Sequence, residues 1–318
     1  MNDTANDVTV VITCFNQAGS IQQSVESACA QTCPSARVIV VDDASDDEET
    51  QKTLAVLAHR PALEVVHRAR NGGPSAARNT GIKRVSTPLV VVLDGDDCFE
   101  PEYIEATRTE LMADERVFAA SSWMRTFGVL GATVRPSGGE VEKFLCRNAA
   151  PATCMFRVSA LRRSGGYDES MRKGFEDWDC YLSLFETLAQ DERPSRVAMV
   201  EKPLIRYRTA PASSNIVSMN SRLELLRYLI GKHRDLYQEH LEEAILGFEK
   251  TGIHRLSLFE ATVKSNPELI EHCEDVKGFM ASPSFGDGGM AAAVRIESQF
   301  TAESRAKTGN IADTPEFF

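Results

Sequence analysis

The sequence predicts an α/β fold of the Rossmann-like kind, in which helices flank a mixed, mainly parallel sheet. Four short apolar runs rich in Val and Ile alternate with three helical stretches in the first half of the chain. Each run ends in polar residues, Gly or Pro, as the buried strands of parallel sheets do. This repetition implies right-handed crossovers and a doubly wound sheet.

The order of the elements can be read from these patterns. The expected strands cover residues 8–13, 37–41, 63–67 and 89–93, and the expected helices cover residues 20–31, 48–58 and 75–85. Further strands are expected at residues 117–123, 153–156, 197–200 and 204–208, with helices at 158–164 and 176–189. Asp46 and Asp47 suit the N-cap of the second helix.

After the last expected strand the pattern becomes helical. Leu223, Leu226, Leu229 and Ile230 have the spacing of one helix face. We therefore predict one α/β domain over residues 1–215 and a C-terminal helical extension over 216–318, with a homo-oligomer through these helices left open. Residues 282–318 are rich in Gly, Ala, Ser and Thr and are expected to form a mobile tail or a docking segment.

Charge and composition exclude some partners. The net charge of −11 argues against nucleic acid or an anionic membrane as the main partner, since both need clustered Lys and Arg. No run approaches the roughly 20 apolar residues of a spanning helix. We expect a cytoplasmic protein, with peripheral association at the inner face of the membrane left open. The eight cysteines are scattered, which favours free thiols.

Polar residues come after each of the first four expected strands. In open α/β sheets, ligands bind beyond the carboxyl ends of the strands. After the fourth strand, Asp94, Asp96 and Asp97 place three carboxylates around Gly95. Such a cluster is costly unless a cation or hydrogen-bond donors occupy the space, and Mg²⁺ or Mn²⁺ suits it. A solvated acidic turn is the equally open alternative.

Two further strand ends carry candidate ligand groups. Asp42 and Asp43 suit hydrogen bonds from a base imide or a ribose hydroxyl; the alternative is simple helix capping by Asp46 and turn formation by its neighbours. Residues 71–81 lead through two glycines into a helix start that favours anions. Arg78 in that helix would reach a diphosphate or brace an aspartate; the alternative is an exposed loop with a surface arginine.

A last acidic segment opens the helix expected at residue 176. Glu176, Asp177 and Asp179 lie where the helix dipole stabilises carboxylates, so simple capping is one explanation. Phe175 and Trp178 offer an apolar platform that would pack against a sugar. An apolar environment raises the proton affinity of a carboxylate, as a general base requires.

Taken in order, these segments resemble the inverting glycosyltransferases of family 2, which have the GT-A fold. The matching segments are residues 10–16, 40–46, 71–81, 93–97, 165–168, 176–179 and 207–208. The resemblance implies a nucleotide-sugar donor, with UDP expected, and a divalent metal. It implies inversion by single in-line displacement, with hexosyl or N-acetylhexosaminyl transfer to a glycan, lipid-linked or peptide acceptor.

The resemblance also implies roles for individual residues. Asp177 corresponds to the catalytic base, and Asp96 and Asp97 correspond to metal-binding positions. The expected donor contacts are Thr13, Phe15, Asn16, Asp42, Asp43, Asn71, Arg78, Asp94, Glu176, Trp178 and Arg208.

The chain departs from the family at one position. Many members carry a His two residues after the Tyr-Arg pair, and here that position is Ala210. Two alternatives therefore remain beside sugar transfer: a catalytically weak nucleotide-sugar-binding protein of the same fold, or a sugar nucleotidyltransferase. The latter usually needs a Gly-rich, basic loop after the first strand, and residues 13–17 lack one.

Overall fold

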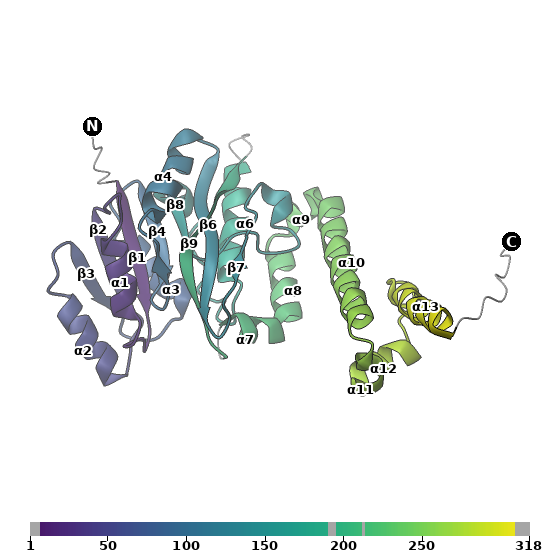
Figure 1. Ribbon diagram of the computed structural model, residues 1–318. Helices are drawn as coiled ribbons and strands as arrows, with labels where there is room; N and C mark the ends of the chain where they lie inside the picture. Colours follow the sequence, from purple (N-terminus) through teal and green to yellow (C-terminus); the bar gives the residue numbers. More distant parts are fainter. Residues whose placement is uncertain (1–6, 190–194, 212–213, 309–318) are drawn as a thin grey trace. The chain divides into compact units, whose positions relative to one another are not determined.

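The computed structural model describes residues 7–189, 195–211 and 214–308 (Figure 1). Contacts divide the chain into two compact units, Met1–Glu243 and Ala244–Phe318. The predicted boundary after residue 215 falls inside the first of these units. The assignment of functional domains to the two parts stays a prediction.

The first four strands of the chain form the parallel half of the sheet, as predicted. Its strands are β1 (Val8–Cys14), β2 (Arg37–Asp42), β3 (Leu63–His67) and β4 (Leu89–Asp94), in the order β3-β2-β1-β4. The connecting helices are α1 (Ile21–Cys29), α2 (Glu48–Leu57) and α3 (Pro74–Ile82). Asp47 caps α2, because its carboxylate accepts hydrogen bonds from the backbone N–H groups of Glu49 and Thr50.

The second half of the sheet is mixed. It contains β5 (Cys98–Phe99), β6 (Val117–Gly128), β7 (Thr133–Val134), β8 (Cys154–Arg157) and β9 (Arg196–Thr209). The order continues β4-β8-β6-β9-β5, with β7 on β6. β8 runs antiparallel to β4 and β6, whereas β6 and β9 are parallel. The predicted α/β fold with a mixed, mainly parallel sheet is therefore confirmed.

Two strands predicted at residues 197–200 and 204–208 are one strand, β9. Pro203 interrupts the apolar pattern there, but the pairing continues through it opposite Trp123. The register of the β6–β9 pair shifts on both sides of Trp123. A bulge of this kind lets a residue without an N–H stay in a sheet, so the break in the sequence pattern is not a break in the strand.

The first unit contains further helices after the parallel half-sheet. They are α4 (Tyr103–Ala113), η1 (Val141–Lys143), α5 (Val158–Arg163), α6 (Glu176–Ala189), α7 (Ser214–Asn220), α8 (Arg222–Lys232) and α9 (Arg234–Glu239). The main apolar core lies between the sheet and the helices α1, α2 and α4, and includes the fully buried Val10, Ile12, Val25 and Val91.

The second unit is helical. It contains most of α10 (Leu241–Ser265), followed by α11 (Glu268–His272), α12 (Glu274–Ala281) and α13 (Gly289–Thr308). Ile296 of α13 packs with Val263 and Val276 in a small core. Of the two alternatives for residues 282–318, a mobile tail or a docking segment, this packing favours the second for the described part of α13, whose Ala-rich start favours a helix. Residues 309–318 of that segment lie outside the described residues.

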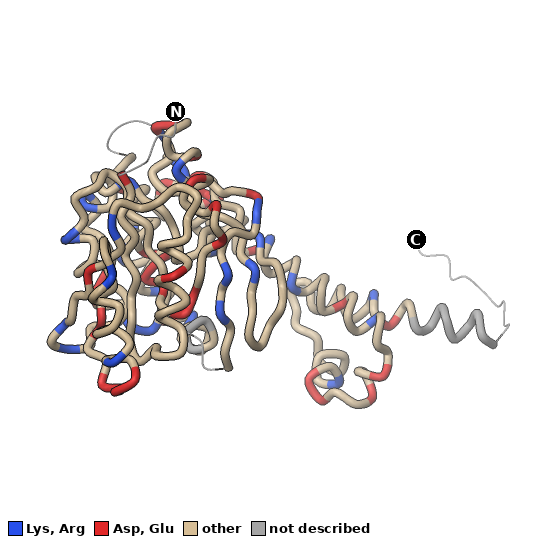
Figure 2. Tube along the Cα trace, turned by 60° about the vertical axis from the view of Figure 1, so that its left-hand side comes forward, with Lys and Arg blue, Asp and Glu red and all other residues tan. Residues whose placement is uncertain are grey.

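Other features of the chain agree with its composition. Within the described ranges, no helix is long and apolar enough to cross a membrane. All eight cysteines are described, and each is a free thiol, as predicted. Acidic and basic residues are interspersed along the traces of both units (Figure 2).

Close packing of α3 on the sheet depends on Gly81. A Cβ atom there would lie 2.3 Å from Cγ1 of Val11 and 3.1 Å from Cγ2 of Val41. Because a valine side chain is stiff, the substitution Gly81→Ala must shift helix or strand, and such overpacking costs about 1–3 kcal/mol. We expect a lower midpoint of urea unfolding.

Gly231→Ala is the matched control for this substitution. It also lies in a helix, but an added Cβ would meet nothing within 4 Å. Alanine is the better helix former, so we expect stabilisation of about 0.5–1 kcal/mol. An unchanged or raised midpoint for Gly81→Ala would contradict the tight α3–sheet contact.

Candidate functional site

The acidic turn after β4 is built around Gly95. A Cβ on this glycine would lie 2.4 Å from both the Thr13 carbonyl oxygen and Oε1 of Gln17, so only glycine lets the turn pass over the end of β1. Asp97 is 2% exposed, and its Oδ1 accepts a hydrogen bond of 2.8 Å from the Arg208 backbone N–H. Asp96 is half-buried and forms no ion pair with another described residue.

The three acids of this turn repel one another. Burial, and then the charge of Asp94, raise the pKa of Asp96 above its ordinary value. Burial, followed by the charges of Asp94 and Asp96, raises the pKa of Asp97 further. The charge of Arg208 lowers the pKa of both carboxyl groups but does not cancel the effects of burial and mutual repulsion, and a bound cation would relieve these further.

Arg78 connects two of the predicted acidic segments. Its guanidinium donates to Oδ1 and Oδ2 of Asp94, at 2.8 and 3.1 Å, and to Oε1 of Glu176 at 2.8 Å. The arginine is 1% exposed and its carbon Cζ lies 5.2 Å from the centre of the Tyr167 ring. Of the two roles considered for Arg78, the structure shows the bracing of an aspartate.

The ring beneath Arg78 is itself held by α3. The Asn79 side chain donates to the Tyr167 carbonyl oxygen at 2.8 Å and accepts from its backbone N–H at 2.9 Å. Gly166, with φ +77°, makes room for this amide, because a Cβ would lie 2.7 Å from Oδ1 of Asn79. The segment of Gly165, Gly166 and Tyr167 therefore holds an aromatic ring against the guanidinium of Arg78.

Asp43 organises the loop before α3. It is 3% exposed, forms an ion pair with Arg68, and accepts hydrogen bonds from the backbone N–H groups of Gly72 and Gly73 at 3.0 and 2.7 Å. Asn71 is exposed on the same loop, where its Oδ1 accepts from Gly73. The predicted contact between Asp43 and the donor stays untested, whereas its contacts with the loop are direct.

Asn16 has a comparable role after β1. Its side chain bonds Asp46 and the backbone N–H of Asp47, and its own N–H donates to Oγ of Ser45. The residue adopts φ +52°, a conformation that Asn tolerates better than most residues. These bonds occupy the amide, so Asn16 shapes the β2–α2 loop.

The other predicted donor residues near β1 differ in exposure. Phe15 is 43% exposed and free to stack on a ligand. Thr13 is buried and donates to Oδ1 of Asp94 at 3.1 Å. Asp42 is also buried and accepts hydrogen bonds from the Ser45 backbone N–H and, at 2.8 Å, pairs with Nδ1 of His67.

Asp177 stands in the first turn of α6 in a half-buried position. Its Oδ1 accepts from the Trp178 backbone N–H and its Oδ2 from the Asn148 side chain, both at 2.8 Å. Burial, followed by the charge of Glu176, raises the pKa of Asp177 to about 7. A carboxylate with such a pKa takes up and releases a proton near neutral pH, as general-base chemistry requires.

The predicted aromatic platform needs a correction. Trp178 is 1% exposed, and its indole N–H donates to the Phe144 carbonyl oxygen. The indole therefore belongs to the core and offers no face to a sugar. The indole excludes water from the start of α6. Phe175, half-buried with φ +64°, packs on the indole ring.

Arg208 lies where the end of β9 meets the acidic turn. Besides its backbone bond to Asp97, its Nε donates to the Asp96 carbonyl oxygen at 3.1 Å, and its guanidinium lies 4.6 Å from the Phe127 ring centre. Ala210 is exposed two residues later. The positive charge beside the acids thus comes from Arg208, close to the position where many family members carry a histidine.

A buried ionic cluster that joins α6 to the end of α8 was not predicted from the sequence. Asp179 is fully buried and bonds Nζ of Lys232 at 2.8 Å and Nε2 of His233 at 2.9 Å. Although burial lowers it, hydrogen bonds to Asp179 and Glu186 raise the pKa of His233 above its ordinary value. No signal in the sequence joins residues 179 and 232; the same is true of Asn148 and Asp177.

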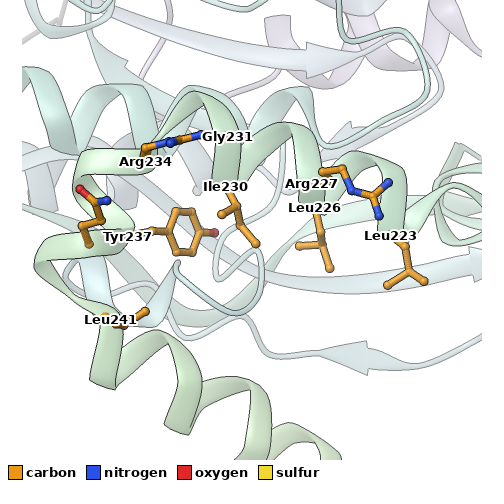
Figure 3. Close-up of a pocket in the computed structure, with 9 residues that line it drawn as sticks. Leu223, Leu226, Arg227, Ile230, Gly231, Arg234, Tyr237 and Leu241 are labelled. Atoms are coloured by element: carbon orange, nitrogen blue, oxygen red, sulfur yellow. The ribbon is translucent and has the colours of Figure 1, made fainter.

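Of the predicted acids, those of the turn after β4 are connected with the start of α6, whereas Asp42 and Asp43 bond other residues. None of these acids lines the apolar groove described below. Contacts connect Thr13, Arg78, Asp94 and Glu176. Arg208 contacts both Asp96 and Asp97, and the Asp97 backbone N–H donates to the Asp94 carbonyl oxygen. Among the described residues, no three His, Cys, Asp or Glu side chains converge closely enough to hold a metal alone. The groove lies on α8 and α9 and is lined by Leu223, Leu226, Ile230 and Tyr237 without any carboxylate (Figure 3).

Replacing Arg78 tests the brace. Arg78→Met keeps the length of the side chain but leaves Asp94 and Glu176 without their cation, so we expect a loss of about 3–5 kcal/mol in the free energy of urea unfolding. Arg78→Lys keeps the charge without the planar fork and is expected to recover only part of that loss. Equal stability of the methionine variant and the wild type would show that the ion pairs contribute nothing.

Part of this sequence is similar to known proteins. Residues 9–165 match the family model described as glycosyl transferase family 2. The succinoglycan biosynthesis proteins ExoO and ExoU of Rhizobium meliloti are 37% and 40% identical over 100 and 95 residues, which is 31% and 30% of this chain. In both cases the match spans only 28% of the relative's own length.

Solved structures of similar fold extend over nearly the whole chain. A crystal structure of S. aureus TarS residues 1–349 in complex with UDP-GlcNAc has a TM-score of 0.57 at 16% identity and covers 96% of this chain and 95% of that one. A second crystal structure of TarS residues 1–349 has a TM-score of 0.55 at 16% identity. The chain therefore belongs to glycosyl transferase family 2 and has a fold of the GT-A type.

Proposed function

We propose that this protein transfers a sugar from a UDP-sugar to an acceptor hydroxyl with inversion at the anomeric carbon. The observation that carries the proposal is the arrangement of Asp177, with its raised pKa, on a helix that Arg78 and Glu176 tie to the acidic turn. Family membership supports sugar transfer, and the UDP-GlcNAc complex of the TarS structure supports a UDP donor.

The acidic turn fits a divalent cation that shares its shell with the donor. Asp96 forms no ion pair with another described residue, and burial and Asp94 raise its pKa. Mg²⁺ and Mn²⁺ are bound by one or two carboxylates and complete their shell with phosphate oxygens and water. Asp97 bonds the Arg208 backbone, so Asp96 is the better placed of the two proposed metal ligands. A cation held by Asp96, with Asp97 beside it, would supply positive charge to the diphosphate.

The chain's own residues perform the remaining steps. The Asp177 carboxylate takes the proton of the acceptor hydroxyl, whose oxygen forms a bond to the anomeric carbon. The bond from that carbon to the diphosphate breaks, and its electron pair leaves with UDP. Asn148 and the Trp178 backbone N–H hold the carboxylate in orientation, and Arg208, next to the acidic turn, would supply positive charge to the donor diphosphate.

The two alternatives make different predictions for turnover. A nucleotide-sugar-binding protein would bind UDP without transfer or donor hydrolysis, and a nucleotidyltransferase would consume a triphosphate. The intact Asp177 favours transfer over binding alone. Screening nucleotide sugars for Mn²⁺-dependent release of UDP, with and without glycan acceptors, separates the three functions.

The first prediction of this mechanism concerns Asp177→Asn. The substitution keeps the shape but removes the basic carboxylate, so transfer should fall by roughly 10²–10⁴-fold while UDP binding is kept. In the wild type, the transfer rate should rise with pH up to about 7 and then level off, because the deprotonated form is the base. Normal transfer by the variant would disprove the assigned role.

The second prediction concerns the metal. Removal of divalent ions with EDTA should abolish transfer, and Mn²⁺ should restore it. In calorimetry, UDP should bind more tightly with Mn²⁺ than with EDTA, and Asp96→Asn should remove most of this difference. Asp114→Asn is a control of equal charge change, since Asp114 pairs with Arg116 outside the site. Equal affinity of the wild type for UDP with Mn²⁺ and with EDTA would contradict the proposal.

A further inference from the structure

Three arginines form a row across neighbouring strands. Arg206 on β9 is the register partner of Arg125 on β6, and Arg125 is the register partner of Thr133 on β7, two residues before Arg135. Adjacent strands lie about 4.8 Å apart, so the row spans roughly 10 Å. All three side chains are exposed. We call Arg125, Arg135 and Arg206 the arginine row.

Aromatic rings support two members of the row. The carbon Cζ of Arg135 lies 5.2 Å from the ring centre of Trp123, and that of Arg206 lies 5.3 Å from the ring centre of Phe127. Stacking uses the flat face of a guanidinium and leaves its N–H donors free in the plane. The rings therefore hold the two cations in place without neutralising them.

The row is not balanced by acids of the protein. None of its three arginines forms an ion pair with a described residue, whereas Arg78, Arg108 and Arg295 do. Arg125 and Arg206 lie directly opposite each other on neighbouring strands, where their like charges repel. In a chain with 46 acidic residues and a net charge of −11, this unrelieved repulsion points to an anion from outside.

The row starts at the reaction centre and leads away from it. Arg206 is the register partner of Cys98, which comes directly after Asp97. Arg208, two residues further along β9 and therefore on the same face as Arg206, donates from its Nε to the Asp96 carbonyl oxygen, and both guanidinium groups lie over the Phe127 ring. From this end the row continues over β6 and β7, so its far members belong to a different part of the surface from the acidic turn.

We propose that the arginine row binds the acceptor, and that this acceptor is a glycan carrying repeated phosphate or carboxylate groups. The proposal rests on the sugar transfer proposed above. Guanidinium forks match both anions in bidentate geometry, and a row of fixed cations suits a chain with anions at intervals. The acceptor hydroxyl next to an anion at Arg206 would then lie close to the catalytic end of the row.

The test measures binding of defined polymers to the full chain. We choose poly(glycerol phosphate), oligogalacturonate and neutral dextran of matched length, titrated at low and at physiological salt. At least one anionic polymer should bind, more weakly at higher salt, and dextran should not. The anionic polymer that binds identifies the group as phosphate or carboxylate.

Two variants link this binding to the row. Each lost arginine should weaken binding of the anionic polymer by about tenfold, so the double variant Arg125→Gln/Arg135→Gln should lose roughly a hundredfold. Lys83→Gln also removes a positive charge, but from the end of α3, which packs on β1 and β2 at the other end of the sheet. It should bind like the wild type. Thermal melts verify that the variants are folded.

Several outcomes would overturn the inference. These are binding of neither anionic polymer, equal binding by the folded double variant, an equal loss in Lys83→Gln, or tighter binding of an oligothymidylate than of both anionic polymers. Titration of the wild type with UDP and Mn²⁺ tests the donor site separately. UDP binding without polymer binding would reject the arginine row as an acceptor site and leave the proposed transfer standing.

Discussion

The site depends on one buried cation, the guanidinium of Arg78. It connects the end of β4, through Asp94, with the first turn of α6, through Glu176. These elements are separated by about a third of the first unit in sequence, and nothing else described joins the acidic turn so directly to the helix of Asp177. The proposed metal ligands and the proposed base are therefore held relative to each other by the same arginine. Burying its charge costs free energy, which the ion pairs with Asp94 and Glu176 offset.

Other parts of the site are also held in place by bonds within the protein. Several polar groups at the strand ends bond the protein itself: Asp43 holds the glycines before α3, and Asn16 holds the loop before α2. Such bonds fix backbone groups and neighbours in place before a ligand arrives. Groups with little internal bonding, namely the exposed Phe15 and the carboxylate of Asp96, which pairs with no described cation, then become the natural points of first contact.

The periodic parts of the fold could be predicted from sequence, and the contacts between distant segments could not. Alternating Val-rich runs and helices identified the parallel half of the sheet, because burial on both faces imposes that pattern. Local pattern failed where tertiary context decides: Pro203 lies inside β9, and α13 forms in a segment of weak periodicity. For the site, the acids were identified, but Trp178 proved to be a core residue and Asn148 gave no signal.

The buried Asp179 has a consequence for where the folding unit ends. Its charge is matched by Lys232 and His233, which come well after the last strand. A shortened chain that ended after β9 would leave the buried Asp179 carboxylate without a counter-charge. This carboxylate lies in the first turn of α6, the helix that also carries Asp177. Helix α8 and the residue that follows it, which look like an appendage in the sequence, thus supply the counter-charges of an acid on α6.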